Sequence, residues 1–587
     1  MTLTIDRRGL LRGSAAIGGT AALAAWFPAW AQPVSAGIAR PLPTVSGEDI
    51  HLKIAEQMIN INGRHSHAIG INGTVPGPLI RLREGQHVRL HVENTLDEDS
   101  SIHWHGLILP FHMDGVPGVS FPGIKPRSTF VYEFPILQSG TYWYHSHSGL
   151  QEQLGHYGPI VIDPAGEDPI RSDREHVIVL SDYSRMHPHV IFKKLKQQGG
   201  YFNYQKQTLA GMLAGRDQSL KERLEWGAMR MDPTDVSDVT GSIYTYLING
   251  HGPDDNWTAL FRPGERVRLR LVNASAMTTF NFRIPGLKLT VVQADGLAVR
   301  PVTFDEMQIA VAETYDLIVE PMEDRAYTMV AENVDRSGMA RATLAPREGM
   351  VAEVPPVRER PLADMKDMGM GGMDHGGGGD ACAPEHAAMG HCTPGAEAGK
   401  MEHSMRDMSL APEVKDTPTV QSISPMPVDR MGEPGQGLSD AGHKVLVYSD
   451  LMAVDRNPDV RAPERSMRIH LTGNMERYMW AFDGVKLNEV KDPIPFRKDE
   501  RVRITLVNDT MMGHPIHLHG HFFELVTGHG EYAPRKHTIQ VQPGGTATFD
   551  FTADAVGDWA FHCHLLYHMH AGMMQVVTVR PGEGDAA

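Results

Sequence analysis

The residues with the clearest chemistry lie near the C-terminal end, in the run His562-Cys563-His564-Leu565-Leu566-Tyr567-His568-Met569-His570-Ala571-Gly572-Met573. Two imidazoles, one thiolate and a weak axial thioether are the ligand set of a blue-copper electron-transfer site. Side chains alternate between the two faces of a β-strand, so Cys563 can face one metal while His562 and His564 face others. The run therefore predicts a covalent path between two metal centres.

Three further pairs of alternating histidines occur upstream. They are His103-Trp104-His105, His145-Ser146-His147 and His517-Leu518-His519, the last with His514 three residues before it. On a strand, each pair places two imidazoles on one face. A single pair is weak evidence, because exposed strands carry alternate histidines by chance. Four pairs, one of which encloses the cysteine, predict a metal-binding protein.

A threefold repeat predicts the elements that hold these histidines. Residues 85–94, 264–273 and 499–508 resemble one another, and each alternates apolar and polar side chains as a half-buried strand does. Each segment follows a two-residue turn of the type that joins β-hairpins, namely Asn72-Gly73, Asn249-Gly250 and Asp483-Gly484. The repeat predicts an all-β chain of three Greek-key β-sandwich domains.

The repeat also predicts which domains bind metal. Each repeated segment ends in an asparagine, and nine residues beyond it stand His103, Phe282 and His517 respectively. The first and third domains therefore keep the histidines and the second does not. We expect the second domain to be a metal-free spacer that fixes the angle between the other two.

Composition and the N-terminal residues predict an exported protein. Arg7-Arg8 precedes an apolar run that ends at Ala29-Trp30-Ala31, as a twin-arginine signal peptide does. No other stretch is long and apolar enough to span a membrane. The net charge of -16 argues against nucleic acid as a partner, and three cysteines are too few for a disulfide framework. We expect a periplasmic protein that is not membrane-spanning.

The 587 residues divide into five expected parts. They are a twin-arginine signal peptide at 1–31, domain 1 at 45–166, domain 2 at 172–347, a Met/His-rich flexible segment at 348–441 and domain 3 at 442–582. Domain 2 contains an insertion at about 186–240. Within the insertion the spacing of Leu209, Leu213, Leu220 and Leu224 predicts a packed helix.

The segment at 348–441 is rich in Gly, Pro and acidic residues and shows no strand pattern, so we expect it to be flexible. Its methionines, histidines and cysteines fall mostly between Met365 and Met408, and soft sulfur donors select Cu(I). Two alternatives stay open: an ordinary linker with incidental metal affinity, or a disulfide between Cys382 and Cys392, which an oxidising compartment favours.

The four histidine motifs resemble those of the multicopper oxidases over the whole expected mature chain. The export signal, the Met/His-rich segment and the domain lengths are most similar to the periplasmic copper-resistance protein A subfamily. The resemblance implies three cupredoxin domains and four copper ions. Type 1 copper would take His514, Cys563, His568 and axial Met573, and type 2 copper would take His103 and His517. The type 3 pair would take His105, His145, His147, His519, His562 and His564.

The resemblance also implies a reaction. A reductant would give single electrons to type 1 copper, and Cys563 would pass them to the other three ions, where dioxygen is reduced to water. Asp114, nine residues after His105, matches the family's acid beside these ions and is our candidate proton donor. Its alternative role is that of an ordinary turn residue, because an Asp-Gly pair is common in turns.

The expected substrate is Cu(I), with dioxygen as the electron acceptor and copper resistance as the role. Oxidation of phenols, as in a laccase, is one alternative. A protein that only sequesters copper is another. We expect a monomer whose candidate partners are other periplasmic copper-handling proteins.

Overall fold

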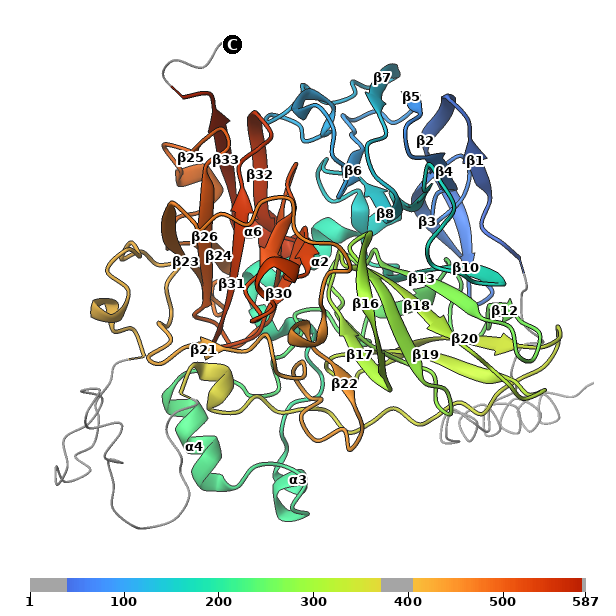
Figure 1. Ribbon diagram of the computed structural model, residues 1–587. Coiled ribbons are helices and arrows are strands. Elements are labelled where there is room, and N and C mark those ends of the chain that lie inside the picture. Colours follow the sequence, from blue (N-terminus) through green and yellow to red (C-terminus); the bar gives the residue numbers. More distant parts are fainter. Residues whose placement is uncertain (1–39, 371–404, 583–587) are drawn as a thin grey trace, which may run out of the picture.

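The computed structural model describes residues 40–370 and 405–582. The expected signal peptide and both Cys382 and Cys392 lie outside these ranges. The described chain forms three β-sandwiches, coloured blue to cyan, green to yellow and orange to red in Figure 1, which meet at the centre of the molecule. The prediction of an all-β fold with a helical insertion in the second sandwich is confirmed.

The first sandwich pairs a five-stranded sheet with a four-stranded one. The five-stranded sheet runs in the order β1 (Thr44–Ser46), β4 (Leu79–Arg83), β9 (Tyr157–Asp163), β8 (Gly140–His145) and β6 (His103–His105). The second sheet runs in the order β3 (Arg64–Ile71), β2 (Asp49–Ile61), β5 (His87–Asn94) and β7 (Ser128–Pro135). Buried aliphatic and aromatic side chains fill the space between them as a separate core.

The second sandwich consists of two six-stranded sheets. One runs in the order β11 (Tyr244–Ile248), β10 (Arg174–Ser184), β13 (Val267–Asn273), β18 (Thr314–Val319), β15 (Leu289–Ala294) and β16 (Leu297–Phe304). The other runs in the order β12 (Thr258–Leu260), β20 (Met339–Ala345), β19 (Tyr327–Asn333), β14 (Phe280–Arg283), β17 (Glu306–Ile309) and β22 (Val445–Leu446).

The third sandwich places a five-stranded sheet against a larger one. The larger sheet runs in the order β24 (Met479–Phe482), β23 (Arg465–Asn474), β26 (Arg501–Asn508), β31 (Gly545–Thr552), β28 (Phe523–Leu525) and β29 (Arg535–Lys536), with β21 (Val428–Asp429) on β31. The other runs in the order β25 (Ile494–Arg497), β33 (Met574–Arg580), β32 (Gly557–Cys563), β27 (His514–Leu518) and β30 (Thr538–Val541). Its buried apolar side chains form one continuous cluster with those of the second sandwich, so these two sandwiches share a core.

The threefold repeat corresponds to β5, β13 and β26. The three turns that precede these strands have positive φ at both central residues, as tight hairpin turns of Asn-Gly and Asp-Gly require. Each strand ends in an asparagine whose amide donates at least two hydrogen bonds to carbonyls of the following loop and strands. In each sandwich the loop held by this asparagine leads into the next strand discussed here, which is β6 in the first sandwich, β14 in the second and β27 in the third. In β14 the position of His103 and His517 is occupied by Phe282, which is fully buried.

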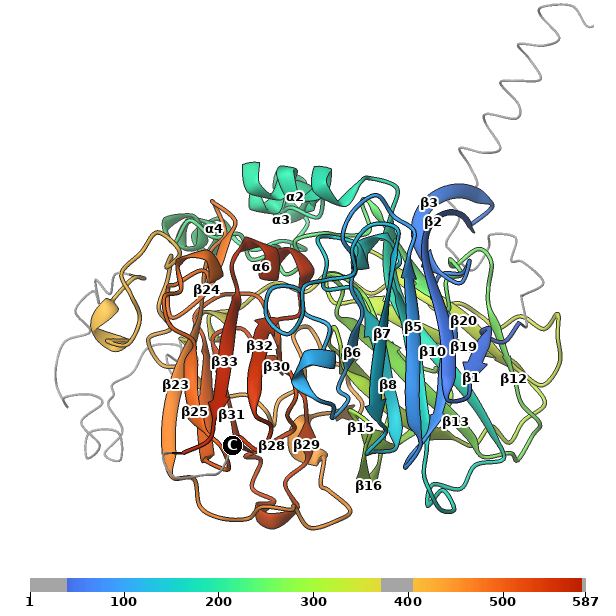
Figure 2. The ribbon, with the colours of Figure 1, turned by 90° about the horizontal axis from the view of Figure 1, so that it is seen from above.

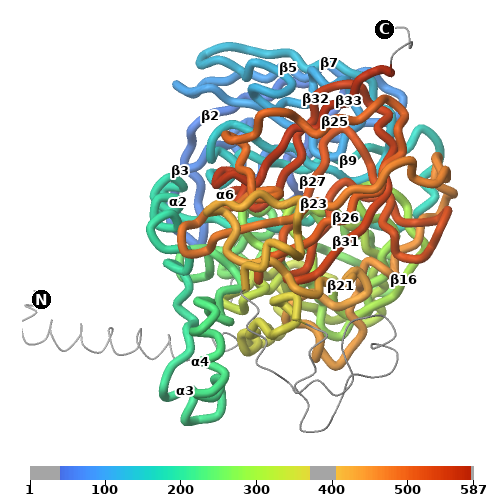
Figure 3. Tube along the Cα trace, turned by 90° about the vertical axis from the view of Figure 1, so that its left-hand side faces the viewer, coloured from blue at the N-terminus to red at the C-terminus, as the bar shows by residue number. Residues whose placement is uncertain are grey.

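The insertion of the second sandwich forms α2 (Pro188–Gln197), α3 (Leu209–Leu213) and α4 (Leu220–Ala228). α2 lies over α6 (Leu566–Ala571) of the third sandwich (Figure 2), whereas α3 and α4 project from the body as a hairpin (Figures 1 and 3). None of the helices in the described ranges is long and apolar enough to cross a membrane.

The prediction that the four leucines of the insertion pack against the body is wrong. The exposed fractions are 65% for Leu209, 77% for Leu213, 62% for Leu220 and 65% for Leu224. The chain turns at Gly215, with φ of +67°, so the leucines belong to two short helices instead of one long face. α4 packs against the body through Trp226, which is buried among methionines.

Two parts of the segment that we expected to be flexible have defined contacts. Residues 348–370 include η5 (Lys366–Met368), which lies beside α4 in Figure 1 and buries Met368 against Trp226. Residues 405–441 bury a small apolar cluster around Ile423. Arg430 ties the two parts together through a buried ion pair of 2.7 Å with Asp367. The composition of the segment did not predict these contacts, because few apolar residues make them. Residues 371–404 lie outside the described ranges.

Candidate metal centres

Strand pairing brings the histidine motifs face to face. In the first sandwich β6 pairs antiparallel with β8, which sets His103 opposite His145. In the third sandwich β27 pairs antiparallel with β32, which sets His517 opposite His562 and Ile516 opposite Cys563. The hydrogen bonds of Asn94 and Asn508 hold the loops that precede β6 and β27, and so fix where these strands begin.

Eight imidazoles from the first and third sandwiches then form one group at their junction. The ring of His105 stacks on that of His517 with centroids 3.9 Å apart, and the rings of His103 and His519 lie 4.0 Å apart. Sets of three ligand nitrogens within 4.8 Å of one another include His103 with His517 and His519, His103 with His105 and His145, and His147 with His519 and His562. The eighth ring, that of His564, lies 4.9 Å from His145 and 5.0 Å from His105.

Hydrogen bonds to one nitrogen of a ring aim the other nitrogen into the group. Nδ1 of His103 donates to the carbonyl of Asp114 (2.7 Å), and Nδ1 of His517 donates to the carbonyl of His537 (2.7 Å). Their Nε2 atoms are buried and have no partner among the described residues. A buried polar atom without a partner costs about 1–3 kcal/mol, and a bound cation would remove that cost.

His105 is oriented the other way round. Its Nε2 lies 3.3 Å from the hydroxyl of Thr538, while its buried Nδ1 has no partner within the described part of the chain. His105 therefore presents Nδ1 to the group where His103 and His517 present Nε2.

A second, separate set lies on the other face of β32. Sγ of Cys563 is 3.6 Å from Nδ1 of His514 and 3.9 Å from Nδ1 of His568, and these two nitrogens are 3.2 Å apart. The triangle has the size expected around one metal ion with bonds of about 2.0–2.3 Å to nitrogen and sulfur. Nε2 of His514 is held by Thr510 (2.8 Å), which leaves Nδ1 free for the ion.

The protonation chemistry of both sets suits a metal. Burial lowers the pKa of His105, His145 and His517, and that of His562 to about 4, so these rings are neutral, as metal ligands must be. Burial raises the pKa of the Cys563 thiol. A thiolate in this place needs an adjacent positive charge, which a coordinated ion supplies. The donors present therefore fit copper.

Met573, the expected axial ligand, lies beside Cys563. It is fully buried, and its carbonyl accepts from the backbone N–H of Cys563 (3.1 Å). The neighbouring Met574 instead packs against Val116 of the first sandwich. We therefore keep Met573 as the proposed axial group.

Because the axial group tunes the potential of blue copper, Met573→Leu should raise the type 1 potential and keep the blue colour. A redox titration followed at the blue band measures both. Loss of the blue band in this variant would show that Met573 holds the site together and does not tune it.

Asp114 joins the two halves of the eight-histidine group. Its Oδ2 accepts from Nδ1 of His519 (2.9 Å), and its Oδ1 lies 3.3 Å from Nδ1 of His103. The carboxylate is buried, so it is more than a surface turn residue.

Sequence reasoning missed three residues that touch the predicted ligands. Oδ2 of Asp238 accepts from Nε2 of His568 (2.6 Å), and burial raises the pKa of this carboxyl to about 7. Oε2 of Glu152 lies 2.7 Å from Nδ1 of His145, and burial raises the pKa of Glu152 well above its ordinary value. The third is His537, which groups with His105 and His517. None of the three belongs to an alternating histidine pair, so only the fold reveals them.

Known proteins resemble this chain over most of its length. Family models described as multicopper oxidase match residues 53–167, 175–349 and 461–583. A copper resistance protein A homolog of Pseudomonas syringae pv. tomato is 48% identical, over 99% of this chain and 100% of that protein. The chain belongs to the multicopper oxidase family. A copper resistance protein A of Escherichia coli is 46% identical, over 99% of this chain and 100% of that one.

Solved structures show the same fold. This multicopper oxidase matches the structure of Fet3p, described as a multicopper oxidase that functions in iron import, with a TM-score of 0.62, 18% identity and coverage of 91% of this chain and 90% of that one. A laccase from Botrytis aclada matches with a TM-score of 0.62, 20% identity and coverage of 92% and 88%. Together with the family matches, these structures identify the sandwiches as cupredoxin domains. The protein is an oxidoreductase that uses copper.

Proposed function

We propose that this multicopper oxidase is a periplasmic enzyme of copper resistance that couples the one-electron oxidation of Cu(I) to the four-electron reduction of dioxygen to water. The observation that carries the choice of substrate is a cluster of methionines beside the loop that holds His514. The similarity to copper resistance proteins A supports the role, and the Arg7-Arg8 signal supports export.

The donor sets support four copper ions. Type 1 copper is assigned to His514, Cys563 and His568 with Met573 on the axis, and type 2 copper to His103 and His517. The type 3 pair is assigned to His105, His145, His147, His519, His562 and His564. When bound, the copper ions would supply the one-electron steps and the place at which dioxygen is reduced.

The chain's own residues perform three tasks in this scheme. Cys563, between His562 and His564 in the chain, links the type 1 set to the other set through a short run of covalent bonds. Asp114 orients His519 and lies beside the eight-histidine group, where its carboxyl can deliver protons. Burial of the ligands excludes water from the path between the two sets.

The methionine cluster comprises eight residues that share one apolar region. They are Met229, Met231, Met365, Met368, Met370, Met405, Met475 and Met511. Met511 is fully buried and follows Thr510, whose hydroxyl holds His514. Thioethers are soft donors that select Cu(I) and offer nothing to a phenol. The cluster thus supports Cu(I) as substrate in preference to phenols.

The triple variant Met365→Leu, Met370→Leu, Met405→Leu tests this assignment. Leucine keeps the volume and removes the thioethers, at a cost in stability that is usually below about 1.5 kcal/mol. A deletion from 365 to 408 would be less informative, because it also removes the buried Met368. We expect KM for Cu(I) to rise about tenfold, which corresponds to about 1.4 kcal/mol of binding, and phenol oxidation to stay unchanged. Oxygen uptake with each substrate measures both.

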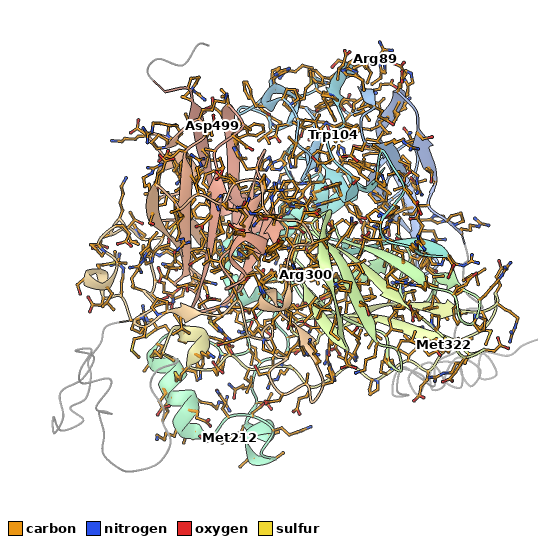
Figure 4. The ribbon with its side chains drawn as sticks, in the orientation of Figure 1. Arg89, Trp104, Met212, Arg300, Met322 and Asp499 are labelled. Carbon is orange, nitrogen blue, oxygen red and sulfur yellow. The ribbon has the colours of Figure 1, made fainter. Side chains whose placement is uncertain are left out.

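The control is Met322→Leu. Met322 is 71% exposed and lies at the far end of the second sandwich, away from the cluster (Figure 4). Equal losses on both substrates in the triple variant would indicate a structural role for the cluster. An unchanged KM for Cu(I), together with fewer weakly bound ions per chain, would favour the alternative of copper storage.

A further inference from the structure

A buried ion group lies where the second sandwich meets the third. Lys536 of β29 and Asp295 are fully buried, and Glu313 is almost so. The ammonium of Lys536 is 3.0 Å from Oδ1 of Asp295 and 3.1 Å from Oε1 of Glu313. Hydroxyls of Tyr448 (2.7 Å) and Tyr315 (3.1 Å) donate to the same oxygen of Glu313. Burial opposes the charge on Lys536, but the two carboxylates outweigh it and raise the pKa of the amine.

Asp295 occupies the turn between β15 and β16, and this turn touches all three sandwiches. The following Gly296 packs so closely on Tyr142 of the first sandwich that a Cβ would lie 2.2 Å from the ring. Toward the third sandwich, Oδ2 of Asp295 accepts from the backbone N–H groups of His537 and Thr538, both at 3.1 Å. A side chain of the metal-free sandwich therefore holds one short piece of backbone in the third.

That piece of backbone orients proposed copper ligands from two sandwiches. The carbonyl of His537 accepts from Nδ1 of His517 (2.7 Å). The hydroxyl of Thr538 lies 3.3 Å from Nε2 of His105, the ring that presents its Nδ1 to the group. The contacts thus run without a break from Asp295, through residues 537–538, to a type 2 ligand and a type 3 ligand. Within the described part of the chain, neither ring has a hydrogen-bond partner other than residues 537 and 538.

We propose that Asp295 is a positioning residue for the three-copper group, with Lys536 and Glu313 as the ions that allow its carboxylate to be buried. The proposal rests on the assignment of His105 and His517 as copper ligands. It gives the metal-free sandwich a specific task, because that sandwich sets the geometry of a copper site to which it contributes no ligand. A merely structural ion group would stabilise the junction of the sandwiches without favouring any one copper site.

Asp295→Asn in the full-length, copper-loaded protein is the first test. The amide keeps the size of the side chain but has one acceptor oxygen in place of two. Its NH2 must therefore face either the peptide N–H groups of residues 537–538 or the ammonium of Lys536, and both of these are donors. Residues that orient metal ligands typically change metal affinity by about 10–100-fold when mutated, so we expect a loss of that size in type 2 affinity. Paramagnetic resonance during titration with a copper chelator measures it. The blue band of type 1 copper should be unaffected.

Glu332→Gln is the matched control. Glu332 is equally buried within an ion cluster of the second sandwich, with Arg283, Arg336 and Arg358, and none of these touches a proposed copper ligand. We expect this variant to lower Tm and to leave type 2 affinity as in the wild type. If Asp295→Asn instead lost type 1 and type 2 copper in parallel, or lost neither, the positioning role would be overturned.

If Asp295→Asn fails to fold, Thr538→Val provides a second test of the proposed contacts. It is close to isosteric, keeps all three buried charges and removes only the hydroxyl beside His105 and His517. A changed type 2 resonance or a weakened type 3 absorption with an intact blue band supports the proposal, and unchanged signals overturn it. A wild-type protein that showed no type 2 resonance would instead refute the four-copper assignment, so the two failures are distinguishable.

Discussion

Cys563→Ser should remove the intense blue absorption and abolish turnover on every substrate. The colour requires a thiolate bound to copper, and the structure places Sγ of Cys563 within 4 Å of both Nδ1 atoms that would complete the site. Serine has nearly the same size, but its hydroxyl gives no comparable absorption. Visible spectroscopy and oxygen uptake measure the two losses, and we expect both to be complete within detection.

Type 2 copper should stay visible by paramagnetic resonance in the same variant, because His103 and His517 lie in the other ligand set. Met574→Leu is a suitable control, since Met574 packs against Val116 outside both sets and should keep colour and turnover. A blue Cys563→Ser protein would refute the type 1 assignment outright.

Asp114→Asn should slow dioxygen reduction about a hundredfold, the lower end of what general acid catalysis contributes. The amide can still accept from His519 or His103 through its oxygen, so the ligands should stay in place and the blue band should be retained. It cannot deliver a proton as the carboxyl does. The rate at which reduced enzyme is reoxidised by dioxygen measures the effect separately from oxidation of the substrate.

Asp97→Asn is the control for the loss of one negative charge. Asp97 is exposed, in the same sandwich as Asp114, and pairs only with Arg127 among the charged groups of the described residues. Its turnover should match that of the wild type. Normal turnover of Asp114→Asn at every pH from about 5 to 8 would contradict a role in proton delivery and reduce Asp114 to a structural residue.

Short-range patterns in the sequence predicted which histidines come together, whereas contacts between residues far apart in the chain could not be predicted from it. The pairs of alternating histidines are local, because strand geometry alone puts both rings on one face. Asp238 is a different case. Asp238 and His568 are 330 positions apart in the chain, and no sequence pattern near either residue predicts their hydrogen bond.

Helical periodicity and composition were informative about secondary structure and less so about burial. The leucine spacing correctly predicted helix in the insertion, yet Leu213 is exposed because the chain breaks at Gly215 and Trp226 makes the contact with the body. Likewise, the Gly- and Pro-rich composition of 348–441 did not predict the buried ion pair between Arg430 and Asp367. Two residues make this contact, and they contribute little to the average composition of the segment.

The distribution of the ligands along the chain has a consequence for how the molecule is assembled. Asp114 and His519, which touch, are separated by 405 positions, and the contact between His105 and Thr538 spans 433. Ions held by His103 and His517 would act as cross-links between the first and third sandwiches, which lie far apart in the chain. The first and third sandwiches can be cross-linked in this way only after all three sandwiches have folded and packed together. We therefore expect the chain to acquire these ions only after the described sandwiches have folded, so that bound copper would report a correctly assembled molecule.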